Sequence, residues 1–361
     1  MPLVPSYIKT LANYIPGKPI EDVQRELGLK NIIKLASNEN SMGPSPLALE
    51  AIQKSMKLTH RYPDSSGYNL RKKLSENYNV KLDNVVLGAG SEGIMSTIMR
   101  TFLLQDDEII TAKNSFIGFR VLANASGRKV HWVPMKNYRY DLKAMSEKIN
   151  EYTKIIYIAN PDNPMGTYIT REEFDDFYKI VPERVLIILD EAYFEYAQKE
   201  KNFPDSMKYR YDNIITLRTF SKVYGLAGVR IGYGFAHESL IRNLMKVKVP
   251  FEPSFLAQVS GFSALEDKLF IDKSLKLNGE GMNYLYENFS KLNVRVVPSV
   301  ANFVTTVWNS PKQAKSIFEK LLKKGIIVRH LNSFGWTDCL RVSIGLKEEN
   351  KRLIECLKSI V

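Results

Sequence analysis

Short apolar runs that alternate with longer helical patterns constrain the fold of this chain most. Strands are expected at 84–87, 108–111, 129–133, 154–158, 185–189, 213–217 and 229–235, and helical segments separate most of them. Apolar strands joined by helices are typical of a mostly parallel sheet that helices cover on both faces. The alternation therefore predicts an α/β domain with a mostly parallel, seven-stranded sheet.

The pattern changes after Pro250 and Pro253. Long amphipathic stretches occupy 254–290, and strands are expected at 294–297, 303–307 and 340–344. We expect a large α/β domain at 41–249 and a smaller α+β domain formed by 1–40 together with 250–361. Because no repeat or flexible linker is visible, the two domains should pack against each other.

Composition and charge narrow the class of protein. A chain of 361 residues with 44% hydrophobic and 25% charged residues is globular in composition. No apolar run approaches the roughly 20 residues of a membrane span, so no membrane partner is expected. The N-terminus lacks a continuous apolar stretch before a cleavage site, which favours a cytoplasmic location. The net charge of +12 is spread along the chain, so we expect no dedicated nucleic-acid surface.

The two cysteines, Cys339 and Cys356, lie far apart in the sequence, with no CxxC motif and no clustered histidines. We therefore expect neither a disulfide framework nor a metal site.

The segment GAGSEG, from Gly88 to Gly93, follows an expected strand and precedes an expected helix. It matches the GxGxxG pattern of dinucleotide-binding folds, but the next strand is followed by Lys113 and Asn114 rather than by an acid that could hold a ribose. Small residues at a helix N-terminus still expose backbone N–H groups, which bind an anion such as a phosphate. A tight turn without a ligand is the alternative.

Polar side chains follow three further expected strands, at the edge where open α/β sheets bind ligands. In chain order they are Asn163, Asp190, Tyr193, Thr219, Ser221, Lys222 and Arg230. Pyridoxal phosphate chemistry needs such a set: a lysine binds the cofactor covalently, a buried aspartate keeps the pyridine nitrogen protonated, and a cup of donors anchors the phosphate. The lysine amine then serves as general base at the substrate α-carbon. The set predicts a pyridoxal phosphate site built on Lys222 and Asp190.

Motifs along nearly the whole chain support this prediction. They are NYIPGK (13–18), LASNEN (35–40), RYPD (61–64), GAGSEG, NPDNPMGT (160–167), DEAY (190–193), TFSKVYGLAGVRIGY (219–233), GIIVR (325–329) and LRVSIG (340–345). With these motifs the chain resembles the fold-type-I, aspartate-aminotransferase-like enzymes, and most closely the histidinol-phosphate aminotransferase family. The lysine-to-arginine module and the two C-terminal arginines are the specific parts of the resemblance.

The resemblance implies a role for each cofactor residue. Lys222 would hold pyridoxal 5'-phosphate, Asp190 would pair with the pyridine nitrogen, and Tyr193 and Asn163 would bond the ring hydroxyl, which makes Lys222, Asp190 and Tyr193 the candidate catalytic residues. The phosphate would be surrounded by Gly90, Ser91, Glu92, Thr219, Ser221 and Arg230. Phe116 would stack on the ring. Tyr62 would reach the cofactor phosphate of a second subunit, which implies a homodimer with a shared active site.

The same resemblance implies a substrate site. Its residues would be Tyr14, Asn38, Asn163, Arg329 and Arg341. Arg341 falls where such enzymes hold a substrate carboxylate, and Arg329 supplies a second fixed cation, because the planar guanidinium binds carboxylate or phosphate with two bonds. The expected reaction moves an amino group between L-histidinol phosphate and 2-oxoglutarate in a ping-pong cycle.

Three alternatives remain open at this point. An aromatic amino-acid or phosphorylated-polyol aminotransferase would use the same cofactor residues, and so would a phospho-amino-acid decarboxylase on this fold. A non-catalytic cofactor-sensing module would normally follow a DNA-binding domain, for which the residues before Asn13 are too few.

Overall fold

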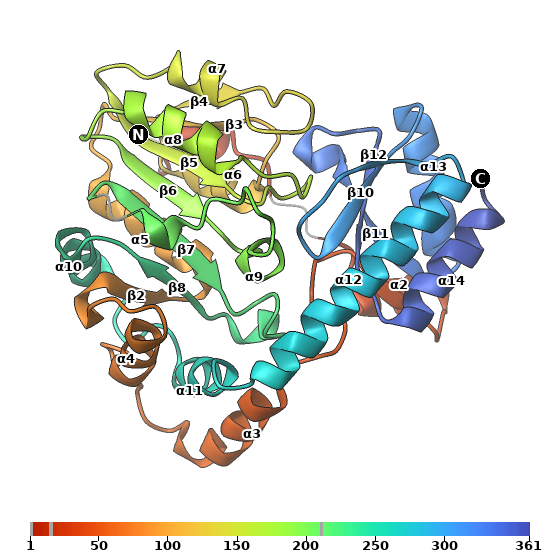
Figure 1. The fold of residues 1–361 in the computed structure, drawn as a ribbon, viewed down its shortest axis with the longest axis horizontal. Coiled ribbons are helices and arrows are strands. Elements are labelled where there is room, and N and C mark those ends of the chain that lie inside the picture. Colours follow the sequence, from red (N-terminus) through yellow and green to blue (C-terminus); the bar gives the residue numbers. More distant parts are fainter. Residues whose placement is uncertain (1–2, 14–16, 210–211) are drawn as a thin grey trace.

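The computed structural model describes residues 3–13, 17–209 and 212–361, which form two lobes, each built around its own sheet (Figure 1). The strands are β1 (Ile33–Leu35), β2 (Val85–Gly88), β3 (Glu108–Ala112), β4 (Lys129–Val133), β5 (Thr153–Ala159), β6 (Leu186–Asp190), β7 (Ile214–Thr219), β8 (Gly232–Phe235), β9 (Arg295–Val297), β10 (Phe303–Val307), β11 (Ile326–His330) and β12 (Cys339–Ser343).

The helices cover both sheets. The α-helices are α1 (Ser6–Lys9), α2 (Ile20–Leu27), α3 (Pro46–Ser55), α4 (Tyr68–Asn77), α5 (Gly90–Phe102), α6 (Ile117–Ala125), α7 (Leu142–Ser146), α8 (Arg171–Ile180), α9 (Phe194–Ala197), α10 (Glu238–Val247), α11 (Phe255–Ala264), α12 (Lys268–Lys291), α13 (Pro311–Lys323) and α14 (Lys347–Lys358). Short 3-10 turns are η1 (Met56–Leu58), η2 (Leu82–Asn84), η3 (Ser206–Lys208), η4 (Ala227–Val229) and η5 (Leu331–Phe334).

The larger sheet confirms the predicted fold class. In the described residues its strand order is β2-β8-β7-β6-β5-β3-β4, and every strand is parallel except β8, which runs antiparallel to β7 and β2. The strand expected at 229–235 begins only at Gly232, because residues 227–229 form a 3-10 turn and Arg230 takes a left-handed φ of 60°. Since β8 is reversed, it starts at the edge where β7 ends, with Thr219 paired to Gly232.

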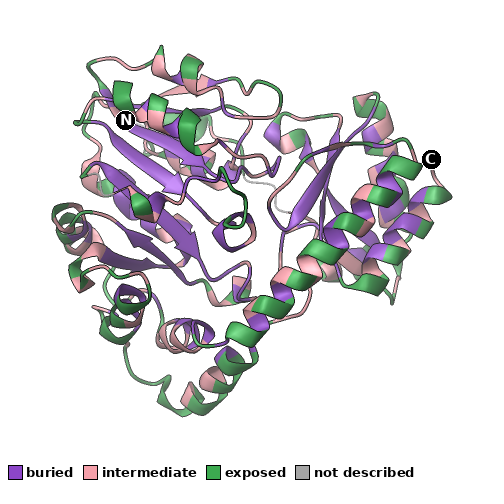
Figure 2. Cartoon of the chain, in the orientation of Figure 1, coloured by how far each residue is buried: buried purple, intermediate pink, exposed green. Residues whose placement is uncertain are grey.

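The central strands are buried on both faces, as their sequences predict. Every residue of β6 is buried, and the sheet interior is enclosed by helices on either side (Figure 2). Helix α8 shows how one covering helix forms: Thr170 caps it by accepting from the N–H of Glu173, and the Glu173 carboxylate returns a bond to Thr170 N–H. Its apolar side then buries Phe174 and Phe177, each contributing about 2 kcal/mol by removal of apolar surface from water.

The smaller sheet has the order β1-β11-β12-β10-β9. Strand β1 pairs parallel to β11, so residues 33–35 lie beside 326–328 although almost 300 positions separate them along the chain. The predicted domain boundary at residue 250 stays a prediction. Helix α11, which follows that boundary, packs on α3 and α4 of the larger lobe, where Ala257 joins Ala48 and Leu70 in one apolar cluster.

Helix α12 joins the lobes. Its 24 residues span about 36 Å and run from the start of α3 to the smaller sheet (Figure 1). Asp267 caps α12 by accepting from Phe270 N–H at 3.3 Å, and it accepts from the hydroxyl of Ser45, the cap of α3, at 2.6 Å. One carboxylate therefore fixes the starts of both helices.

No helix in the described ranges is long and apolar enough to cross a membrane.

Candidate active site

Asp190 is the last residue of β6 and lies at the edge where the parallel strands end. Its side chain is 4% exposed, and Tyr157 donates its hydroxyl to Asp190 Oδ2 at 2.7 Å. The other oxygen, Oδ1, is buried and has no hydrogen-bond partner among the described residues. Burial raises the pKa of Asp190 to about 7, against the lowering effect of the Tyr157 bond. This carboxylate is poised to accept a hydrogen bond from a ligand.

Lys222 follows β7 in the turn that leads to β8. Its Nζ lies 5.4 Å from the centre of the Tyr193 ring. The Tyr193 hydroxyl accepts from Asn38 Nδ2 at 2.9 Å, and Asn38 is held by Ser343, whose hydroxyl accepts from Asn38 N–H at 2.8 Å. A lysine, a phenol and an amide from both lobes therefore meet in one place.

A cradle of donors lies beside Asp190. Thr219 Oγ1 donates to Ser221 Oγ at 2.9 Å, and Arg230 Nη1 donates to the same Ser221 oxygen at 3.3 Å. Gly90 opens α5 with a φ of +72°, and a Cβ there would stand 2.5 Å from Arg230 Nη2. Glycine at 90 therefore lets the guanidinium lie against the helix N-terminus, where the N–H groups of the first turn are not used by the helix.

Ser91 and Glu92 belong to that first turn, and the Glu92 carboxylate lies 3.5 Å from Arg230 Nη2. Helix N–H groups, two hydroxyls and an arginine therefore surround one small volume, which suits an anion with several oxygens.

Asn163 and Arg341 contact each other from opposite lobes. Arg341 Nη1 donates to Asn163 Oδ1, and Arg341 Nη2 donates to the carbonyl of Ala36 at 2.8 Å. Because the amide oxygen of Asn163 accepts from the arginine, Nδ2 is the donor group of this side chain, and Asn163 lines the cleft. Arg329 is the partner of Arg341 across the antiparallel pair β11 and β12, and both guanidinium groups lie 5.9 Å from the centre of the Phe334 ring.

These groups line two adjoining pockets of about 510 and 370 Å³. Both pockets are lined by Ser37, Glu92, Phe116, Asn163 and Lys222. The smaller one adds Ser91, Asp190, Tyr193, Thr219, Ser221 and Arg230, and the larger one adds Asn38, Arg329 and Arg341. The structure therefore brings most of the expected site residues into one cleft.

Of the expected residues that the structure describes, Gly90 and Tyr62 line neither pocket, and Gly90 lies beside Arg230 instead. Tyr62 is 82% exposed and stacks on Phe251, with ring centres 4.4 Å apart. Tyr14 lies outside the described residues.

Several residues that line the cleft or bond a residue lining it were not anticipated from the sequence. Tyr157, which bonds Asp190, sits in the apolar run of β5, where a phenol among isoleucines is a weak signal of a buried polar partner. Phe334 and Val121 line the larger pocket from segments without a motif, so no local signal could have found them.

The fold and the cleft define a class of enzyme, and comparison with known proteins agrees. The family model described as "Aminotransferase class I and II" matches residues 30–357. The chain belongs to this family of aminotransferases.

Particular relatives narrow the comparison. The chain is 42% identical over 357 residues to a histidinol-phosphate aminotransferase of Moorella thermoacetica, covering 98% of this chain and 92% of that protein. It is 41% identical to another of Anaeromyxobacter sp. (strain Fw109-5), with 100% of both chains covered. A solved structure of histidinol-phosphate aminotransferase from Sinorhizobium meliloti in complex with pyridoxal-5'-phosphate superposes with a TM-score of 0.91 at 26% identity, covering 100% of this chain and 99% of that one.

Proposed function

We propose that this chain is a pyridoxal phosphate enzyme that moves an amino group between L-histidinol phosphate and 2-oxoglutarate. The observation that carries the proposal is the buried Asp190 Oδ1, which lacks a partner among the described residues and lines the same pocket as Lys222 and the donor cradle. The names of the full-length relatives at about 40% identity support the substrate. The cytoplasmic location expected from the sequence stays a prediction.

The residues present fit the cofactor at each of its polar ends. Asp190 would accept from the protonated pyridine nitrogen, because a buried carboxylate atom otherwise pays the full cost of lost hydration. Asn163 Nδ2 and the Tyr193 hydroxyl would bond the ring oxygen, and Phe116 would cover the ring face. The phosphate would lie among Gly90, Ser91, Glu92, Thr219, Ser221 and Arg230, with Ser91 and Glu92 acting through backbone N–H groups. When bound, pyridoxal phosphate supplies an electron-withdrawing ring that stabilises negative charge at the substrate α-carbon.

The chain's own groups would then move the proton and hold the substrate. The Lys222 amine would take the proton from the substrate α-carbon as a general base and would then deliver a proton, as a general acid, to the carbon on the other side of the amino nitrogen. Arg329 and Arg341, opposite each other on β11 and β12, would grip a phosphate or a carboxylate. Tyr14 and Asn38 would complete the substrate site; Tyr14 was implicated by the sequence alone.

An amino-donor screen tests the substrate. The holoenzyme without an oxo-acid is mixed with histidinol phosphate, glutamate, phenylalanine, phosphoserine or serinol phosphate, and loss of the cofactor's visible absorbance is followed. Histidinol phosphate and glutamate should react fastest. Phenylalanine or serinol phosphate in first place would favour the other aminotransferase activities, and release of carbon dioxide from phosphoserine would favour a decarboxylase.

The same screen on Arg329→Ala locates the phosphate contact. Loss of a guanidinium that binds an anion through two hydrogen bonds, shielded from water, costs about 2–5 kcal/mol. For histidinol phosphate, kcat/KM should therefore fall roughly thirty- to several-thousand-fold. Glutamate offers its α-carboxylate to Arg341 and should lose much less. Arg295→Ala, on the exposed start of β9, serves as the control. Equal losses on both substrates would instead assign Arg329 a general anion-binding role.

We propose that two copies form a homodimer with shared active sites. Supporting this, large apolar side chains are exposed along residues 47–68 and at Val249 and Phe251, beside Tyr62. Exposed apolar surface of this kind marks an interface in soluble proteins. In the dimer, Tyr62 would donate its hydroxyl to the phosphate held in the other copy's cleft.

Mixing variants tests the shared site. Tyr62→Phe removes one bond to a charged group, worth about 1.5–3 kcal/mol, so it should weaken cofactor binding roughly ten- to a hundredfold. Lys222→Ala should be inactive alone. A mixed dimer has one site that lacks both groups and one that is intact, so mixing should restore part of the activity. If subunits exchange, as shown by mass spectrometry, but activity does not return, each site is complete within one copy.

A further inference from the structure

Asp162 is a fully buried carboxyl group that the proposed reaction does not use. It is 0% exposed and lies in the loop that leaves β5. Its Oδ1 accepts from the Ser115 hydroxyl, and its Oδ2 accepts from Met165 N–H at 3.0 Å. Burial raises the pKa of Asp162 to about 7, whereas these two bonds and the nearby Arg341 favour the ionised form. Each carboxylate oxygen is therefore matched to a donor.

The bond from Ser115 is the last of a series of hydrogen bonds in which each hydroxyl donates to the next group. Ala159 N–H donates to the Tyr140 hydroxyl at 3.0 Å, and because Ser115 uses its only hydroxyl proton on Asp162, Tyr140 is the donor in its 2.7 Å bond to Ser115 Oγ. Ser115 in turn donates to Asp162. Because each hydroxyl accepts one bond and donates one, all the protons in the chain have fixed positions.

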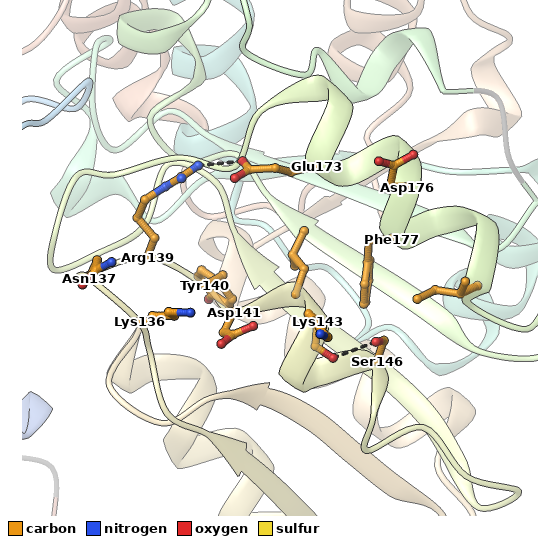
Figure 3. Close-up of a pocket in the computed structure, with 12 residues that line it drawn as sticks. Lys136, Asn137, Arg139, Tyr140, Asp141, Lys143, Ser146, Glu173, Asp176 and Phe177 are labelled. Carbon is orange, nitrogen blue, oxygen red and sulfur yellow. Dashed lines mark hydrogen bonds and ion pairs between the residues drawn. The ribbon is translucent and has the colours of Figure 1, made fainter.

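These hydrogen bonds connect three loops that follow neighbouring strands at the same edge of the sheet. Ser115 lies after β3, Tyr140 after β4, and Ala159 and Asp162 at the end of β5. Tyr140 also lines a surface pocket of about 450 Å³ outside the cleft, between the loop at 136–143 and α8 (Figure 3). The network thus runs from a residue that lines that pocket to the loops of the candidate active site.

Both loops that the network joins carry a cofactor candidate. Ser115 directly precedes Phe116, and Asp162 directly precedes Asn163. Met165 N–H, the second donor to Asp162, lies on the far side of Asn163, so the carboxylate holds the loop on both sides of that residue. Gly166 N–H closes the same loop by donating to the Asp162 carbonyl at 2.9 Å.

We propose that Asp162 is a positioning residue, which ties the Phe116 loop to the Asn163 loop so that the ring-covering and ring-bonding groups keep one spacing. The inference rests on the proposed pyridoxal phosphate site. Neither Asp162 nor Ser115 nor Tyr140 touches the cofactor in this account; they act through their neighbours.

Asp162→Asn is the sharpest test because it keeps the size of the side chain. Asparagine has one acceptor oxygen and one NH₂ group, so it can satisfy Ser115 or Met165 N–H but presents a donor to the other. Tyr178→Phe is the matched control: it removes a hydroxyl bonded to Asn213 at 2.6 Å, remote from the cleft. Apo forms of wild type and both variants are titrated with pyridoxal phosphate by equilibrium dialysis, and visible circular dichroism per bound cofactor reports the placement of the ring.

Asp162→Asn should bind pyridoxal phosphate at least tenfold more weakly than wild type and show an altered visible dichroism, while Tyr178→Phe changes neither. If Asp162→Asn does not fold, Ser115→Ala removes the hydrogen bond between the same two loops. This variant should bind pyridoxal phosphate at least threefold more weakly and show the same spectral change. Wild-type affinity and dichroism in the variant that folds would overturn the positioning role. If wild type itself binds no pyridoxal phosphate, the proposed function fails instead.

Discussion

Lys222→Ala is expected to lose transamination by at least about 10⁴-fold in kcat, the largest effect of any single change in the chain. General base catalysis alone contributes about 10²- to 10⁴-fold, and covalent attachment of the cofactor adds to it. Lys222 Nζ lies 5.4 Å from the Tyr193 ring centre, and Lys222 is the one lysine among the described residues that line the two pockets, so no other lysine there can replace it. Stopped-flow absorbance of a single half-reaction with glutamate measures the loss.

The control for this variant is Lys154→Ala, which truncates a lysine of β5 away from the cleft. It should retain near wild-type rates. Should Lys222→Ala keep both multiple turnovers and the wild-type visible spectrum of bound cofactor, another residue holds the cofactor.

Asp190→Asn is expected to fold, bind pyridoxal phosphate and still turn over roughly 10²- to 10⁴-fold more slowly. The amide can keep the bond from Tyr157 but cannot balance a buried cation, and loss of such a partner costs about 3–5 kcal/mol. The measurement is the rate at which the substrate α-proton exchanges with solvent, followed by NMR.

Tyr157→Phe separates charge from hydrogen bonding. It removes the 2.7 Å bond but leaves the carboxylate, so its loss should be about tenfold, in line with one bond to a charged group. A near wild-type rate in Asp190→Asn would contradict the assignment. Glu191 could not easily take over, because Arg218 holds its carboxylate through bonds of 2.8 and 2.9 Å and both side chains are 1% exposed.

The larger lobe was predictable because its signals are local. Apolar runs of four to seven residues mark buried parallel strands, and the polar residues that end them meet at one edge for geometrical reasons. The start of β8 was placed too early because apolar Val229 and Ile231 flank Arg230, whose left-handed φ of 60° breaks the strand. In this conformation the Arg230 guanidinium lies against Gly90, a contact with another part of the chain that no local pattern reveals.

The smaller lobe was less predictable because its pairings are not local. Strand β1 has three residues and exists only because β11 lies beside it. Arg329 and Arg341 face each other because of the register in which β11 and β12 pair. A spacing of twelve residues in the sequence does not determine that register. The Asp162 network was also hidden, because a buried aspartate, serine and tyrosine are recognised only when their loops are seen to meet.

Antiparallel β8 has a mechanical consequence. Because Thr219 and Gly232 face each other across β7 and β8, the loop that carries Lys222 and Arg230 leaves one sheet and returns to the same sheet edge. The two residues proposed to anchor the cofactor are thus both held by the larger sheet. Arg329 and Arg341 stand on the other sheet. A rotation of one lobe against the other would therefore change the distance between the arginines and Lys222 while leaving the span between Lys222 and Arg230 unchanged, and it would act on the Asn163 loop through the bond from Arg341.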